Sequence, residues 1–221
     1  MPSLGRLSRL ILPGFLQRPL REAVIARRDQ ADLRAYRSRS RDACEAEPTP
    51  HAVKVETVLG AARRHGLRIL VETGTFEGEM ARKCRHAFRS IVTIELDEAL
   101  AHAATQRLAP YKNVRVVQGD SGARLPEILA RIQEPALFWL DGHYSGTGTA
   151  RGDQETPLEE ELHAIARHGE RHVVLIDDAR LLGTGDYPTK DRVLAILRSA
   201  QSGMSARIED DIMVCEAPSS L

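Results

Sequence analysis

Short apolar runs recur along the chain from residue 69 onward, and longer stretches with helical spacing of apolar residues separate them. A continuous apolar run bounded by turn residues is typical of a strand that helices cover on both faces. Seven strands are predicted, at about 69–71, 91–94, 114–117, 136–140, 172–176, 206–208 and 212–215. Because strands and helices alternate, we predict an α/β fold: a mostly parallel, seven-stranded sheet with helices on both faces.

The predicted helices are placed by their caps and breakers. The clearest covers 51–65 and is followed by Gly66 as a stop, and Asp97 is placed to cap a helix that ends near Leu108. The apolar stripe of the first of these helices is expected at Val55, Val58, Leu59 and Ala62. Further helices are predicted at about 81–88, 121–132, 157–168 and 190–200. Right-handed crossovers then bring the loops that follow the parallel strands to one edge of the sheet.

The N-terminal part of the chain differs in composition from the rest. Ten arginines precede residue 42 against three acidic residues, and prolines at 48 and 50 mark a boundary. We therefore predict an arginine-rich helical extension over residues 1–48, with a helix at about 19–37, and a second unit over 49–221. Two interpretations of the extension stay open: a basic amphipathic arm that contacts a membrane surface or a partner protein, and a helix that packs on the second unit.

The overall composition excludes few classes. The formal net charge is zero and aromatic residues make up 4% of the chain, so a nucleic-acid partner is not expected. The three cysteines show no paired metal-ligand spacing, which favours a reducing compartment, the cytoplasm. No apolar run approaches the length of a membrane-spanning helix, and the short apolar stretch near the N-terminus lacks the features of a signal peptide.

The stretch 68–78 predicts a buried strand, a glycine turn and the start of a helix. Gly74 allows a tight turn at the end of the strand, and Gly78 allows the helix to approach the sheet or a ligand closely. Glu95 ends the next strand about 20 residues later, where an acid can accept hydrogen bonds from ribose hydroxyls. Phe76 stands near the place of the second glycine of a dinucleotide fingerprint. Together these features predict a Rossmann-like site for a nucleoside-bearing cofactor.

With these motifs in place, residues 50–216 resemble the class I S-adenosylmethionine (SAM)-dependent methyltransferases. The acid-x-Gly signature of that family is matched by Glu72-Thr73-Gly74, and Phe76 departs from it, because many members carry glycine there. The resemblance implies that Glu95 holds the ribose. It further implies that the methionine part of SAM is surrounded by Glu72, Gly74, Thr75 and Gly78. The adenine would be contacted by Asp120 and Ser121.

Simpler roles remain open for the acidic members of this set. Glu72 could pair with a cation, Asp120 could serve only as a helix cap, and Glu95 could be an ordinary carboxylate at the end of a strand.

Three more acidic residues follow the fourth and fifth predicted strands. In the family's usual sheet order these strands are neighbours, which would bring Asp141 close to Asp177 and Asp178. Clustered carboxylates repel one another unless a cation neutralises them, and ligands that are all oxygen favour Mg²⁺. The pattern resembles the cation-dependent O-methyltransferases, including the macrocin O-methyltransferase and cephalosporin-hydroxylase-like branch. In the alternative without a metal, Asp178 caps the following helix and Asp177 is a lone polar residue.

The resemblance implies a SAM-dependent O-methyltransferase that acts on a hydroxyl of a small molecule or sugar, assisted by Mg²⁺ bound by Asp141, Asp177 and Asp178, with Asp141 also a catalytic residue. Catechol-type members carry a lysine base shortly after this acid, and the chain has His143 there. An imidazole titrates near neutral pH, so we expect His143 to be the base, although a histidine in a loop is often only a surface residue. Two other function classes stay open: a metal-dependent nucleotide-sugar transferase and a SAM-binding module without catalysis.

Overall fold

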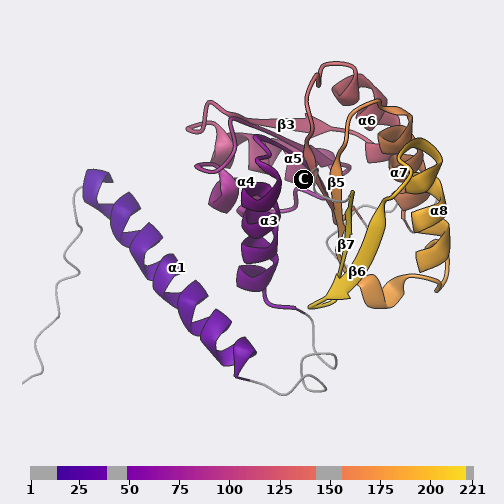
Figure 1. Cartoon of the computed structure of the whole chain (residues 1–221). Helices are drawn as coiled ribbons and strands as arrows, with labels where there is room; N and C mark the ends of the chain where they lie inside the picture. Colours follow the sequence, from indigo (N-terminus) through magenta and orange to yellow (C-terminus); the bar gives the residue numbers. More distant parts are fainter. Residues whose placement is uncertain (1–13, 39–48, 143–155, 218–221) are drawn as a thin grey trace, which may run out of the picture.

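The computed structural model describes residues 14–38, 49–142 and 156–217 (Figure 1). The sheet has seven strands in the order β3-β2-β1-β4-β5-β7-β6. The pairs from β3 to β5 are parallel, and β7 is antiparallel to both β5 and β6. The strands are β1 Ile69–Thr73, β2 Ser90–Glu95, β3 Val114–Gln118, β4 Leu137–Leu140, β5 Val173–Ile176, β6 Ser205–Glu209 and β7 Ile212–Glu216. The predicted seven-stranded, mostly parallel sheet is therefore confirmed.

Helices cover both faces of this sheet, as predicted (Figure 1). They are α1 Gly14–Arg37, α3 His51–His65, α4 Glu79–Cys84, α5 Glu98–Leu108, α6 Ser121–Leu129, α7 Leu158–Arg167 and α8 Lys190–Ala200, with a short 3₁₀ turn at Ala179–Leu181. Neighbouring residues of one strand enter different cores. Leu70 packs in the core under α3 and α4, and Val71 packs in the core under α6, α7 and α8. This explains why the inner strands read as continuous apolar runs.

Two helices end earlier than predicted. The helix expected to reach residue 88 ends at Cys84, because the side-chain amide of Asn113 donates to the carbonyls of Arg85 and Phe88, at 2.7 and 2.9 Å. The helix expected to reach residue 132 ends at Leu129 and continues as a tighter turn closed by hydrogen bonds between residues three apart. The helix at 51–65 has its predicted bounds, and Gly66 ends it with a φ of 65°.

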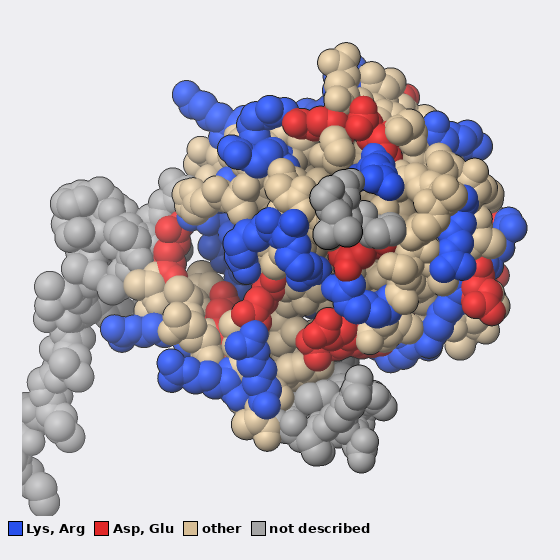
Figure 2. Space-filling model, viewed as in Figure 1, with Lys and Arg blue, Asp and Glu red and all other residues tan. Residues whose placement is uncertain are grey.

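The N-terminal helix α1 begins at Gly14, earlier than predicted, and contacts the second unit through side chains of α3 and the α4 region. Lys83 Nζ lies 2.9 Å from Asp29 Oδ1, and Arg85 Nη2 lies 3.0 Å from Glu22 Oε1. The predicted boundary between the two units falls beside residues 39–48, outside the described part. Within the described residues, no helix is long and apolar enough to cross a membrane. Acidic and basic side chains are interspersed over the face shown in Figure 2.

Candidate cofactor and acceptor site

The turn after β1 lies against the end of β4 so closely that a side chain does not fit. Gly74 adopts a φ of +81°, and its N–H donates to the carbonyl of Ile94 at 2.9 Å. A Cβ atom at this position would lie 2.3 Å from the backbone oxygen of Asp141. Thr75 N–H donates to the same carbonyl of β2 at 3.1 Å. The predicted glycine turn is therefore present, and it joins the carboxyl ends of β1, β2 and β4.

The next residues carry the chain into α4. Gly78 has a φ of +74°, and a Cβ there would lie 2.9 Å from Leu108 Cδ1, so the close approach at Gly78 is to the end of α5 and not, as predicted, to the sheet or a ligand. Phe76 is not glycine but still adopts a positive φ of 45°, and its side chain is 54% exposed. The buried hydroxyl of Thr75 bonds to that of Thr93 at 2.5 Å. The turn is thus tied to β2 by side chains as well as by the backbone.

Glu95 lies at the end of β2, and two backbone N–H groups, one in the glycine turn and one at the start of α5, orient its carboxylate. Its Oε2 accepts a hydrogen bond from Phe76 N–H at 2.7 Å, and its Oε1 accepts one from Asp97 N–H at 3.0 Å. Each carboxylate oxygen can accept a further hydrogen bond. The two oxygens are therefore held in place and keep acceptor capacity for the hydroxyls of a ligand.

Glu72, the acid of the signature, is enclosed at the end of β1. It is 2% exposed, and the Thr93 side chain hydrogen-bonds to it. Burial raises the pKa of Glu72 to about 8, and the nearby charge of Glu95 adds to this shift. Among the described residues, no hydrogen-bond partner faces Glu72 Oε2. A buried acid with an unused oxygen, beside the turn, fits a site that receives a polar group of a ligand or a water molecule.

The residues after β3 form a second part of this edge. Asp120 is exposed and caps α6 by accepting from Ala123 N–H at 2.9 Å, which is the simpler of its two predicted roles. Ser121 is buried and its hydroxyl donates to Glu161 Oε1 at 2.5 Å. The predicted contact of Asp120 and Ser121 with adenine stays a prediction.

Glu161 belongs to this site but was not a predicted member of it. It is buried on α7, it accepts hydrogen bonds from the hydroxyls of Ser121 and Thr73, and burial raises its pKa to about 7. A Cβ at Gly142 would lie 3.3 Å from Glu161 Oε1, which places this acid beside the chain that leaves β4. In the sequence it is the last of three consecutive glutamates at a helix start, where acids usually interact with the helix dipole.

The acids after β4 and β5 do lie at one edge, but a lysine lies among them. Lys54 of α3 forms an ion pair with Asp177 Oδ2, and the carboxylates of Asp141 and Asp178 are near enough to act on it. Burial alone would lower the pKa of Lys54, but these carboxylates outweigh burial and raise it above its ordinary value. Lys54 was not a predicted member of the site.

In the described part of the chain, the acids at this edge are paired with basic side chains and backbone N–H groups and are not arranged as a metal site. Arg180 Nη1 donates to Asp178 Oδ1 at 2.8 Å and also pairs with Asp211, while Asp177 Oδ1 accepts from Asp178 N–H at 2.9 Å. Within residues 14–38, 49–142 and 156–217, no group of three or more His, Cys, Asp or Glu side chains is arranged to hold a metal ion. The carboxylates of Asp177 and Asp178 instead have basic partners. The described arrangement gives the predicted Mg²⁺ site no support.

The predicted base, His143, lies in the segment 143–155, outside the described residues, and its role stays a prediction.

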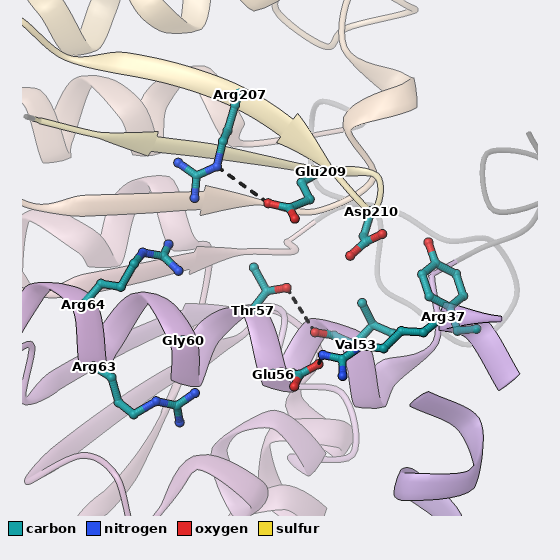
Figure 3. A pocket seen from close by; sticks show the side chains of 11 residues that line it. Arg37, Val53, Glu56, Thr57, Gly60, Arg63, Arg64, Arg207, Glu209 and Asp210 are labelled. Carbon is teal, nitrogen blue, oxygen red and sulfur yellow. Dashed lines mark hydrogen bonds and ion pairs between the residues drawn. The ribbon is translucent and has the colours of Figure 1, made fainter. Parts of the chain in front are cut away.

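A pocket of about 550 Å³ lies between the N-terminal helices and the β6–β7 hairpin (Figure 3). Charged side chains line much of it and pair with one another: Arg37 with Glu56, and Arg207 with Glu209. Of the described residues that line this pocket, none belongs to the predicted site. The pocket is therefore separate from the edge around Gly74.

No protein-family model and no curated protein matches the sequence. The structure, in contrast, is similar to solved methyltransferases. The O-methyltransferase TomG of Streptomyces achromogenes, in complex with SAM, is 18% identical over 75% of this chain and 80% of that chain, with a TM-score of 0.52. An O-methyltransferase of Bacillus cereus, in complex with SAH (S-adenosylhomocysteine), is 16% identical over 74% and 80%, with a TM-score of 0.51.

A methyltransferase of Podospora anserina bound to SAH covers 97% of this chain and 99% of its own, at 14% identity and a TM-score of 0.51. At these identities the likeness concerns the fold. The order of the strands and the glycine turn between β1 and α4 agree with it. The chain has the fold of the class I SAM-dependent methyltransferases.

Proposed function

We propose that the protein is a SAM-dependent methyltransferase that methylates a hydroxyl of a small molecule or sugar. The observation that carries this proposal is Glu95. Its carboxylate lies at the carboxyl end of β2, is oriented by the N–H of Phe76 in the glycine turn and that of Asp97 at the start of α5, and retains acceptor capacity. The adjacent strands β1 and β4 flank the point at which the strand order reverses, where open α/β sheets bind ligands.

SAM would supply a methyl group on a positively charged sulfur. The residues proposed to surround it are Glu72, Gly74, Thr75, Gly78, Glu95, Asp120 and Ser121. The task of the protein is then to orient the two reactants, since alignment supplies much of the rate in such transfers. Gly74 permits close approach of the backbone, and Glu95 would accept the ribose hydroxyls. The neutral form of Glu72 that burial favours offers both a donor and an acceptor to a polar group of the ligand.

On the acceptor side, His143, which follows β4 in the sequence, is the proposed base for the hydroxyl proton. Assistance by Mg²⁺ is left out of this proposal, because basic partners already neutralise Asp177 and Asp178. Nucleic acid is not the proposed acceptor, since the formal net charge of the chain is zero.

The test is a calorimetric titration of the full chain with SAM, repeated on Glu95→Ala. We expect the wild-type protein to bind SAM and the variant to bind it roughly tenfold to a hundredfold more weakly, since a hydrogen bond to a charged group contributes about 1.5–3 kcal/mol. Asp97→Ala is the matched control. It removes the cap of α5 two residues away, where Asp97 Oδ1 accepts from Leu100 N–H at 2.8 Å, but it retains the Glu95 carboxylate.

Equal loss of affinity in the two variants would mean that Glu95 acts only through local stability. A wild-type protein that does not bind SAM would contradict the proposal. If SAM binds but methyl-labelled SAM transfers its label to no member of a broad panel of hydroxyl compounds, the protein is a binding module without catalysis.

A further inference from the structure

Lys54 lies beside the buried face of α3, with its side chain 17% exposed. Of the expected apolar stripe, Val58 and Ala62 are buried and Val55 and Leu59 are partly buried against the same core. The buried face also includes Ala52, Val53 and Ala61. Lys54 is spaced four and seven residues from two of the buried residues, Val58 and Ala61, and therefore lies along this face. A lysine rarely occupies such a position unless its ammonium group has a partner.

The partner is Asp177, at the carboxyl end of β5. The side chain of Lys54 is 17% exposed and that of Asp177 is 1% exposed, so water screens this ion pair little. Asp177 Oδ1 is occupied by the N–H of Asp178, which leaves Oδ2 for the ammonium group. Both oxygens of this carboxylate thus have hydrogen-bond donors.

The ammonium group of Lys54 also interacts electrostatically with the other acids at this edge of the sheet. The charges of Asp141 and Asp178 act on Lys54 together with that of Asp177. An ammonium group has three donors on a flexible stem, so it can serve more than one acceptor. A divalent cation would need about six oxygen ligands. Within the described residues, the cluster offers carboxylates that already have basic partners.

We propose that the ammonium group of Lys54 takes the place of a divalent cation in this acid cluster. It neutralises Asp177 and Asp141 beside the glycine turn and positions their carboxylates toward the acceptor side of the site. The placement toward an acceptor rests on the function proposed above, but the exclusion of a metal ion by Lys54 does not. The consequence is that the protein works without a divalent cation, although the order of its acids along the sequence resembles that of the cation-dependent O-methyltransferases.

The test removes the charge and asks whether the vacated cluster now binds Mg²⁺. Lys54→Met retains a similar apolar stem without the ammonium group, and Lys112→Met makes the same change at an exposed lysine. Both variants and the wild-type full chain are titrated calorimetrically with MgCl₂ alone. We expect Lys54→Met to bind Mg²⁺ at least about tenfold more tightly than the wild type and Lys112→Met, since uncompensated carboxylates attract a cation. Lys54→Arg, which retains the charge, should resemble the wild type.

Loss of a buried partner can prevent folding. If Lys54→Met is unfolded without metal, the Tm of each protein is measured at increasing Mg²⁺ concentrations. A Tm that rises only for Lys54→Met supports the proposal. Equal Mg²⁺ affinity in all proteins, or no binding and no rise of Tm for Lys54→Met, overturns it. SAM is titrated into the same samples. Failure of the wild type to bind SAM would reject the proposed function, while the Mg²⁺ comparison would still decide the role of Lys54.

Discussion

The Gly74→Ala variant is expected to lose roughly 2–6 kcal/mol of its free energy of unfolding and to lose SAM binding. Two costs add in this estimate: an alanine in a left-handed backbone conformation, and a new atom forced into a packed region. The φ of Gly74 is +81°, and the added Cβ would lie 2.3 Å from the backbone oxygen of Asp141 and 2.8 Å from its carbonyl carbon. Because both neighbours are backbone atoms, β1 and β4 must move apart. Denaturant unfolding followed by circular dichroism measures the loss.

Gly66→Ala is the matched control for this variant. Gly66 has a φ of +65°, but a Cβ there would have nothing within 4 Å. It therefore suffers the conformational cost alone, about 1 kcal/mol. Gly66 also ends α3 just before β1 begins, so SAM affinity should remain unchanged in this variant. If the two variants lose equal stability, the contact with Asp141 is not what requires glycine at position 74.

The elements of the fold could be predicted because their signals are local. The apolar run at Ile69–Val71 identifies β1, and Asp97 caps α5 through a hydrogen bond to Leu100 N–H only three residues away. Gly66 ends α3 by adopting the left-handed conformation that its residue type permits. The positive φ of Gly74 is likewise a local feature, whereas its contact with Asp141 is tertiary. That the fourth and fifth strands are neighbours was implied by the family resemblance, and right-handed crossovers bring the loops after the parallel strands to one edge.

The charge balance of the site could not be predicted in this way. Lys54 and Asp177 are 123 residues apart in the chain, and Ser121 and Glu161 are 40 apart. The acids were correctly expected at one edge, and three clustered carboxylates do require a compensating charge. The sequence does not reveal that α3, which precedes the first strand, provides an ammonium group there. The acids directly follow β4 and β5 in the sequence, so their clustering could be predicted. Lys54 lies 123 residues before Asp177, so a metal ion was the natural inference for the compensating charge.

The shifted pKa of Glu72 is a further property that depends on tertiary burial, and it predicts how stability changes with pH. The pKa rises from 4.5 in the unfolded chain to about 8 in the folded protein. Between these values the folded state binds the proton more strongly than the unfolded state does. Glu72 therefore lowers stability as pH rises, by up to about 1.4 kcal/mol for each pH unit. Glu161, with a folded pKa of about 7, acts in the same direction.

Two histidines oppose this trend at lower pH, so the wild-type curve alone does not isolate Glu72. Burial lowers the folded pKa of His172 to about 4, and desolvation with the nearby charge of Lys83 lowers that of the partly exposed His51 to about 4, so their contribution to stability is lost as pH falls from 6.5 toward that value. The informative quantity is therefore the difference in free energy of unfolding between Glu72→Gln and the wild type.

The Glu72→Gln variant keeps the shape of the side chain and an acceptor for the Thr93 hydroxyl but cannot ionise. Its stability relative to the wild type should be constant below pH 4.5, increase in favour of the variant up to about pH 8, and be constant above it. Urea unfolding at a series of pH values measures this difference, with Glu77→Gln as the control for loss of an exposed carboxylate. A difference that stays constant from pH 5 to pH 8 would mean that Glu72 is ionised in the folded protein, and that its buried oxygen has a partner that compensates its charge.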